Sequence, residues 1–213
     1  MDQCEALMKI ITAAVKSISD SRTEAEAIPV GVSNRHVHLT AEDLEKLFGA
    51  GYELTKLKDL SQPGQFACKE TVTVCGPKGA IEKVRILGPV RKASQIEILA
   101  GDCFKLGVKA PTKLSGELDG TPGITLVGPK GSVQTNGGVM VAKRHIHMLP
   151  ADAERLGVHD GECVCLEAEG ERGGILRNTI IRVTDQSSLE CHLDMEEANA
   201  MGLGSSSTVR IIH

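Results

Sequence analysis

The sequence predicts a mainly β protein with two small β-barrels, short capping helices and an internal two-fold repeat. From Ile28 onward, short runs rich in Val, Ile and Thr alternate with Gly and Pro, which is typical of short strands joined by turns. Gly-Pro-Lys-Gly stands between such runs at 76–79 and again at 128–131, as a hairpin turn would require. Arg-His-x-His occurs at 35–38 and at 144–147. These three observations carry the fold class.

Composition excludes several functions. A chain of 213 residues with 41% hydrophobic content can bury a core in one domain or two small ones. The net charge of −4, with no basic tract, argues against a nucleic-acid partner, and the 2% aromatic content offers no stacking platform. No apolar run has transmembrane length, so no membrane partner is expected. Seven cysteines without a CxxC pair or a secretory signal predict reduced thiols and a cytoplasmic location.

Residues 1–27 predict an amphipathic helix and a linker. Leu7, Ile11, Val15 and Ile18 recur at helical spacing, and the polar stretch 19–27 follows. The helix either docks on the body of the protein or on a partner subunit, or it is a detachable targeting helix.

Three further short helices are expected. Thr40 and Asp43 form a capping-box pattern that opens one of them. Pro150 opens a second, which Gly157 closes, and the third runs from Asp194 to Gly202.

The two Arg-His-x-His copies belong to a longer, gapless repeat with an offset of 109 positions. The identical pairs are Arg35/Arg144, His36/His145, His38/His147, Asp43/Asp152, Glu45/Glu154 and Leu47/Leu156. This pattern predicts a duplicated strand–helix unit, one in each half of the chain.

Each histidine pair predicts half of a metal site. Residues i and i+2 of a strand share one face, so His36 and His38 project together, as do His145 and His147. Two imidazoles on one face are typical of zinc ligands, although duplicated structural histidines would show the same pattern. His192 is the best remaining imidazole, because His159 falls in a surface turn and His213 is the last residue. Spacing alone does not choose among the carboxylates.

Three stretches together resemble the PduL-type phosphate propanoyltransferase family. They are "GVSNRHVHL", "DLSQPGQFACKETVTVCGPKGAIEKVRILGPVRKASQIEI" and "VMVAKRHIHM" with the helix after it. Members of this family are zinc-dependent phosphotransacylases of propanediol-using microcompartments and of acetate metabolism. The resemblance extends from Ile28 to the end of the chain, and both histidine motifs occur in the family's order.

The resemblance implies two zinc ions per chain, with coenzyme A as a substrate or product. His36, His38 and Glu97 would hold one zinc, and His145, His147 and His192 the other. Arg91 would bind phosphate. The implied coenzyme A contacts are Val32, Ser33, Asn34, Lys78, Arg85 and Asn199. It also implies interleaved domains: residues 28–142 would hold the first His-x-His strand and a central barrel. Residues 143–213 would complete the other barrel with the strand near 28–34.

The implied reaction interconverts a short-chain acyl-CoA (propionyl or acetyl) plus phosphate with an acyl phosphate plus coenzyme A. Zinc can polarise the carbonyl or stabilise the thiolate, and the planar fork of Arg91 suits phosphate. Direct attack by phosphate is favoured over an acyl-enzyme on Cys68 or Cys103, since neither adjoins a histidine in sequence. A zinc-dependent thioester or amide hydrolase and a non-catalytic, zinc-stabilised assembly protein are the alternatives. A homodimer is expected, as is a microcompartment shell or cargo partner for the N-terminal helix.

Overall fold

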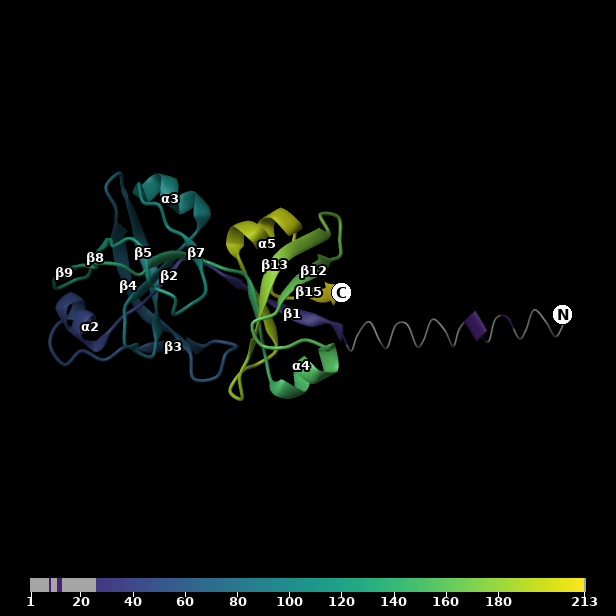
Figure 1. The fold of residues 1–213 in the computed structure, drawn as a ribbon. Helices are drawn as coiled ribbons and strands as arrows, with labels where there is room; N and C mark the ends of the chain where they lie inside the picture. The colour runs from purple at the N-terminus through teal and green to yellow at the C-terminus, as the bar shows by residue number, and fades with distance from the viewer. Residues whose placement is uncertain (1–7, 9–10, 13–25, 213) are drawn as a thin grey trace.

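The computed structural model describes residues 8, 11–12 and 26–212. Residues 28–212 form two β units side by side (Figure 1). Of the predicted N-terminal helix, Leu7, Val15 and Ile18 lie outside the described residues. No helix in the described part of the chain has the length and apolar content needed to span a membrane.

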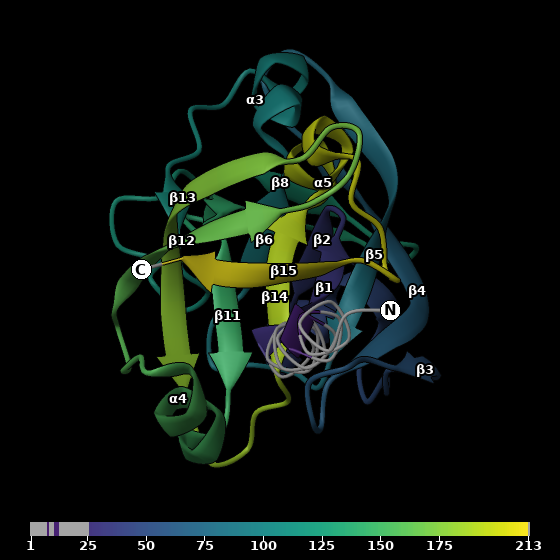
Figure 2. The same ribbon diagram turned by 90° about the vertical axis from the view of Figure 1, so that its right-hand side faces the viewer.

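One unit is a closed barrel of six strands in the order β1-β14-β11-β13-β12-β15 (Figure 2). Its strands are β1 (Ile28–Ser33), β11 (His145–Met148), β12 (Cys163–Ala168), β13 (Gly174–Val183), β14 (Glu190–Asp194) and β15 (Thr208–Ile212). Strand β1 joins the barrel from far away in sequence, because it pairs parallel with β14 and antiparallel with β15. Helices α4 (Pro150–Leu156) and α5 (Met195–Met201) flank the barrel.

The other unit is a nine-stranded sheet. Eight strands follow the order β7-β10-β6-β2-β5-β4-β8-β9, and the ninth, β3, pairs with β4 outside this order. Its strands are β2 (His36–His38), β3 (Lys56–Asp59), β4 (Phe66–Cys75), β5 (Ala80–Gly88), β6 (Gln95–Ile98), β7 (Thr112–Lys113), β8 (Thr125–Val127), β9 (Ser132–Gln134) and β10 (Val139–Ala142). Helices α2 (Ala41–Phe48) and α3 (Ala100–Leu106) accompany it. The mainly β fold with short helices is thus confirmed, with one unit closed by strand pairing and the other formed by this sheet.

Local sequence signals produce these elements as expected. Both Gly-Pro-Lys-Gly segments are hairpin turns, closed by Gly76 N–H donating to Gly79 O at 2.8 Å and Gly128 N–H donating to Gly131 O at 2.9 Å. The Thr40 side chain caps α2, and Gly157 ends α4 in the left-handed conformation, as does Gly202 for α5. Helix α3 had no counterpart among the helices predicted from the sequence.

The duplication extends well beyond the histidine motifs. Strand β2 pairs parallel with β5 and antiparallel with β6, and β11 pairs in the same senses with β13 and β14. Residues 80–108 and 175–203 correspond without a gap at an offset of 95 positions. Lys83 and Asn178, which are equivalent at this offset, have positive φ values of 57° and 60°, and each lies at a register shift. A shared irregularity of this kind supports a common origin for the two halves.

The chain crosses between the units twice. It leaves the barrel after Ser33, builds the nine-stranded sheet from β2 to β10, and returns to the barrel at β11. Each Arg-His-x-His motif therefore begins directly after a crossing. The domain boundaries expected near 28 and 143 stay a prediction. What matters for the site is that both histidine motifs start where the two units meet.

Candidate metal and anion site

One cavity of about 610 Å³ is lined by both units and contains both histidine motifs. The structure brings together the six residues expected as metal ligands as two compact triads. His36, His38 and Glu97 form the first, and His145, His147 and His192 form the second. Within each triad, the potential ligand atoms lie within 4.8 Å of one another.

The first triad depends on the pairing of β2 with β6. His36 lies opposite Glu97 in the antiparallel register, and its Nε2 is 3.3 Å from Glu97 Oε2. His38 shares the face of His36, and the two rings meet edge to face with centroids 5.1 Å apart. Val37, between them, is fully buried in the core. The alternation of the strand therefore aims both imidazoles at the cavity, as the sequence predicts.

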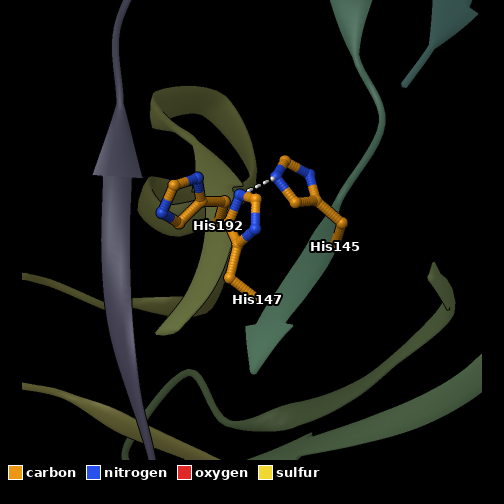
Figure 3. Close-up of side chains that lie close together, drawn as sticks. All are labelled: His145, His147 and His192. Carbon is orange, nitrogen blue, oxygen red and sulfur yellow. Dashed lines mark hydrogen bonds between the residues drawn. The ribbon is translucent and has the colours of Figure 1, made fainter. Parts of the chain in front are cut away.

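The second triad repeats this register. His145 lies opposite His192 across β11 and β14, and Ile146 is fully buried. Figure 3 shows the three rings converging, with His145 Nε2 3.1 Å from His147 Nε2. Their ring centroids are 4.7 to 5.0 Å apart. Three imidazoles from two adjacent strands therefore face one point.

Backbone carbonyls orient the leading histidine of each motif. His36 Nδ1 lies 2.8 Å from Asn34 O, and His145 Nδ1 lies 2.8 Å from Lys143 O. A carbonyl can only accept, so in both rings Nδ1 carries the proton and donates it. Nε2 is then left with its lone pair directed into the triad.

The third member of each triad is held from two positions earlier in its own strand. Gln95 donates from Nε2 to Glu97 Oε1 at 2.5 Å, and its own Oε1 accepts from Gly116 N–H at 2.9 Å. Glu190 Oε2 lies 2.5 Å from His192 Nε2 and also accepts from Ser61 Oγ. Gln95 and Glu190 are equivalent at the 95-residue offset. Each triad therefore has one carboxylate at or beside its third position.

An arginine–carboxylate pair fixes the start of each histidine strand. Arg35 binds both carboxylate oxygens of Asp102 on α3, at 2.7 and 3.0 Å. Arg144 binds Glu197 on α5 at 2.8 Å. Asp102 and Glu197 also accept from the backbone N–H that opens their helices. Each pair therefore ties a histidine strand to the helix that follows the neighbouring ligand strand, with a bidentate geometry for Arg35 and with two donors on one carboxylate oxygen for Arg144.

Burial and mutual repulsion keep most of these imidazoles neutral. Burial, with the neighbouring His36, lowers the pKa of His38 to about 3. Burial, with His192, lowers that of His145 to about 4, and burial, with His145, lowers that of His147 to about 3. Burial would also lower the pKa of His36, but Glu97 outweighs it and the net shift is upward. Burial would raise the pKa of Glu97, but His36 more than offsets this and lowers it.

The triads have the donors that a zinc ion requires. His38 Nδ1 is buried without a hydrogen-bond partner, which is unusual for an imidazole nitrogen inside a protein. Neutral imidazoles and an ionised carboxylate are common zinc ligands, and three protein ligands leave a position open. The donor sets His-His-Glu and His-His-His therefore fit zinc.

Arg91 also faces this cavity, half-buried, and donates to Ser115 Oγ at 3.0 Å. Of the residues expected to contact coenzyme A, Val32, Ser33, Asn34 and Arg85 line the cavity. The other two do not. Lys78 is at the β4–β5 turn with its Nζ 5.7 Å from the Phe104 ring centroid, and Asn199 is exposed on α5.

Four polar residues of the site had not been singled out from the sequence: Gln95, Ser115, Arg182 and Glu190. Ser115 joins Arg91 to Gln95, whose Nε2 lies 2.9 Å from Ser115 Oγ. Gln95, Arg182 and Glu190 lie in structurally equivalent segments, but only Ile86/Ile181 and Gly107/Gly202 are identical at the 95-residue offset, so the sequence alone does not mark them. Ser115 lies between elements, and no sequence signal marks it.

Comparisons with known proteins give one consistent family description. A family model described as phosphate propanoyltransferase matches residues 29–204. A protein named phosphate propanoyltransferase from Thermotoga maritima is 53% identical over 199 residues, covering 93% of this chain and 95% of its own. Proteins of the same name from Rhodobacter capsulatus and Salmonella typhimurium are 52% and 47% identical, covering 92% and 91% of this chain and 91% and 92% of their own.

The depressed pKa values predict an acid-sensitive protein once metal is removed by chelation. His38, His145 and His147 have lower pKa values in the folded protein than in the unfolded chain. Between pH 6.5 and about 4 the unfolded chain therefore binds more protons, and the free energy of unfolding decreases as the pH is lowered. His36 has a raised pKa, so its contribution is fully present below pH 6.5 and is lost as pH rises. Between pH 5 and 6 His36 is protonated in both states and adds little to the slope, so the three lowered groups leave a net dependence of roughly three protons.

Chemical unfolding of the chelated protein across pH 5 to 7 would measure this slope. His147→Gln should reduce it by about one proton. The exposed His159 serves as the control, since His159→Gln should leave the slope as it is. A slope that is insensitive to His147→Gln contradicts the neutral assignment of that imidazole.

Proposed function

This chain belongs to the phosphate propanoyltransferase family and is an acyltransferase, and from that premise we propose that it exchanges a short acyl group between coenzyme A and phosphate in the cavity between its two triads. The observation that carries the proposal is the convergence of both triads and Arg91 on one cavity. Neither an isolated metal site nor an isolated arginine would suit a reaction that must activate a thioester and bind phosphate together.

The first triad, His36, His38 and Glu97, is proposed to hold one zinc, and the second, His145, His147 and His192, a second zinc. Zinc bound there would supply a Lewis acid for the thioester carbonyl and a thiophilic partner for the coenzyme A sulfur. Gln95 and Glu190 would orient the third ligand of each site through the hydrogen bonds described above. Such partners commonly change metal affinity about 10- to 100-fold when removed.

Arg91 is proposed to bind the phosphate that attacks the thioester. Its planar guanidinium can donate two parallel hydrogen bonds to phosphate oxygens, and half-burial strengthens them. Ser115 holds the guanidinium and also contacts Gln95, so the phosphate-binding group and Glu97 are linked through two hydrogen-bonded side chains. This link would keep nucleophile and thioester in a fixed relation, which lowers the entropic cost of their reaction.

Coenzyme A is proposed to approach along the end of β1. Val32, Ser33 and Asn34 line the cavity there, and Arg85 is fixed beside them by hydrogen bonds to Cys68 O at 3.0 Å and Lys69 O at 2.8 Å. Lys78 and Asn199 lie outside the cavity, where they could meet only the parts of coenzyme A remote from its thiol.

Direct attack by phosphate is proposed over an acyl-enzyme. No cysteine in the described part of the chain lines the cavity. Burial raises the pKa of Cys68 to about 11 and that of Cys191 to about 12, so neither is a ready thiolate.

A thiol-release assay tests the function. Propionyl-CoA with phosphate should release free thiol and form acyl phosphate, and His36→Ala or His145→Ala should lower turnover at least about 100-fold. Each variant should also lose bound zinc, measured by elemental analysis. His159→Ala is the matched control, since its side chain is exposed and outside the cavity. Thiol release that does not need phosphate would instead indicate a hydrolase.

Arg91→Lys tests the phosphate site. An ammonium cannot reproduce the bidentate grip, so the KM for phosphate should rise about 10-fold while that for propionyl-CoA changes little. Arg172→Lys, in an exposed turn, is the control. Phosphate kinetics unchanged in Arg91→Lys would remove Arg91 from the site.

Residues 1–24 are proposed to serve location or assembly and not chemistry, because the family match begins at residue 29 and β1 at Ile28. The proposed partners are a second copy of the chain and a microcompartment shell or cargo protein. Deleting residues 1–24 should keep specific activity within about twofold, a difference well under 1 kcal/mol. Light scattering should show any change in assembly. A folded but inactive truncation would assign the segment to the catalytic body.

A further inference from the structure

Arg182 is a second arginine of the cavity for which the fold provides no partner. It lies on β13, opposite His147 in the parallel register with β11, and its half-buried side chain lines the cavity. Its guanidinium forms no ion pair and no side-chain hydrogen bond with any residue that the structure describes. A half-buried guanidinium normally finds such partners, so this one is free to bind a ligand.

The carboxylates of the cavity are already engaged elsewhere. Glu97 contacts His36 and Gln95, and Glu190 contacts His192 and Ser61. Asp194 caps α5 by accepting from Glu197 N–H, and Asp59 pairs with a lysine of its own strand. Among the described residues, the side chain of Arg91 donates only to the neutral Ser115 hydroxyl, and that of Arg85 only to the backbone carbonyls of Cys68 and Lys69. Three guanidinium groups of the cavity therefore lack a matching anion, and of these Arg182 alone has no hydrogen-bond partner among the described residues.

The duplication shows that the fold does not require a charge at this position. Arg182 corresponds to Leu87 at the 95-residue offset, and Leu87 lines the same cavity from the equivalent strand β5. The same place in the same strand thus carries an apolar side chain in one half and a cation in the other. A role in ligand binding explains this difference better than a role in folding.

We propose that Arg182 is a second phosphate-binding residue. It binds the anion from β13 of the barrel, beside the second triad, while Arg91 binds it from the unit of the nine-stranded sheet. The inference rests on the proposed function, because it assumes that phosphate enters this cavity. Phosphate near pH 7 carries between one and two negative charges and several acceptor oxygens, more than one arginine fork can satisfy. Two forks from different units, one on β13 and one in the connection between β5 and β6, would hold it in a defined orientation.

The electrostatics of the cavity agree with this assignment. Burial lowers the pKa of Arg91, Glu97 opposes that shift, and Arg182 adds to it. Arg182 also contributes to the lowered pKa of His145 and His147. An anion placed between these groups would relieve the repulsion, so binding would be favoured by both guanidinium groups together.

Arg182→Leu tests the proposal, because it installs the residue that the equivalent position already carries. The KM for phosphate should rise about 10- to 100-fold, as expected for a lost charge-assisted contact. The KM for propionyl-CoA, the zinc content and the melting temperature should stay close to those of the parent protein. Arg182→Lys should give an intermediate phosphate KM, and Arg172→Leu, outside the cavity, should change none of these values. Inorganic sulfate, as a non-reacting anion, should inhibit Arg182→Leu more weakly than the parent.

An unchanged phosphate KM and sulfate inhibition in Arg182→Leu would overturn the proposal. If Arg91→Lys still raises the phosphate KM, the proposed function stands and only the role of Arg182 falls. If neither variant alters phosphate dependence, the phosphate site itself is misplaced. A rise in the propionyl-CoA KM alone would assign Arg182 to coenzyme A and also overturn the inference. Should Arg182→Leu fail to fold, Arg182→Lys decides by the same two measurements.

Discussion

The site depends on one pairing that occurs twice: a histidine strand set antiparallel to a ligand strand, with His36 opposite Glu97 and His145 opposite His192. A shift of one residue in either register would turn the third ligand to the opposite face of its strand. Two features hold the register. The residues between the histidines, Val37 and Ile146, are fully buried, and an arginine–carboxylate pair ties each histidine strand to the helix after its neighbour.

The two triads are built alike but differ in where their carboxylate stands. In the first, the carboxylate is the member Glu97 and its supporting residue is the neutral Gln95. In the second, the member is the imidazole of His192 and the support is Glu190. A carboxylate that binds a metal directly reduces the effective charge of that metal more than a carboxylate that acts through an imidazole. The two proposed metal sites therefore share one strand arrangement, and metal ions bound there would differ in electrophilic strength.

Much of this could be predicted from the sequence because it rests on local rules. Strand alternation predicted which face His36 and His38 share, and cap residues predicted three of the helices. The choice of Glu97 among 28 acidic residues came only from the family resemblance, since strand pairing is set by contacts between distant residues. Arg182 and Glu190 were missed because the equivalence of their segments is one of strands and pairing, and almost no residue is identical at that offset. The segment between β2 and β4 is longer than its counterpart between β11 and β12. This extra length changes the offset between the halves from 109 to 95 positions.

Duplication followed by divergence would let one cavity serve the two unlike substrates of the proposed reaction. The register shift at Lys83 and Asn178, with its positive φ, and the glycine that ends each helix are kept between the halves. Residues of the site are among those that differ: Glu97 against His192 and Leu87 against Arg182 line the cavity, and Gln95 against Glu190 contact the third member of each triad. An acyl transfer from a thioester to phosphate needs an apolar approach for the acyl chain and a cationic one for the nucleophile. Two identical units could not provide both, whereas these three exchanges make the two halves of the site chemically distinct without altering the strands that form it.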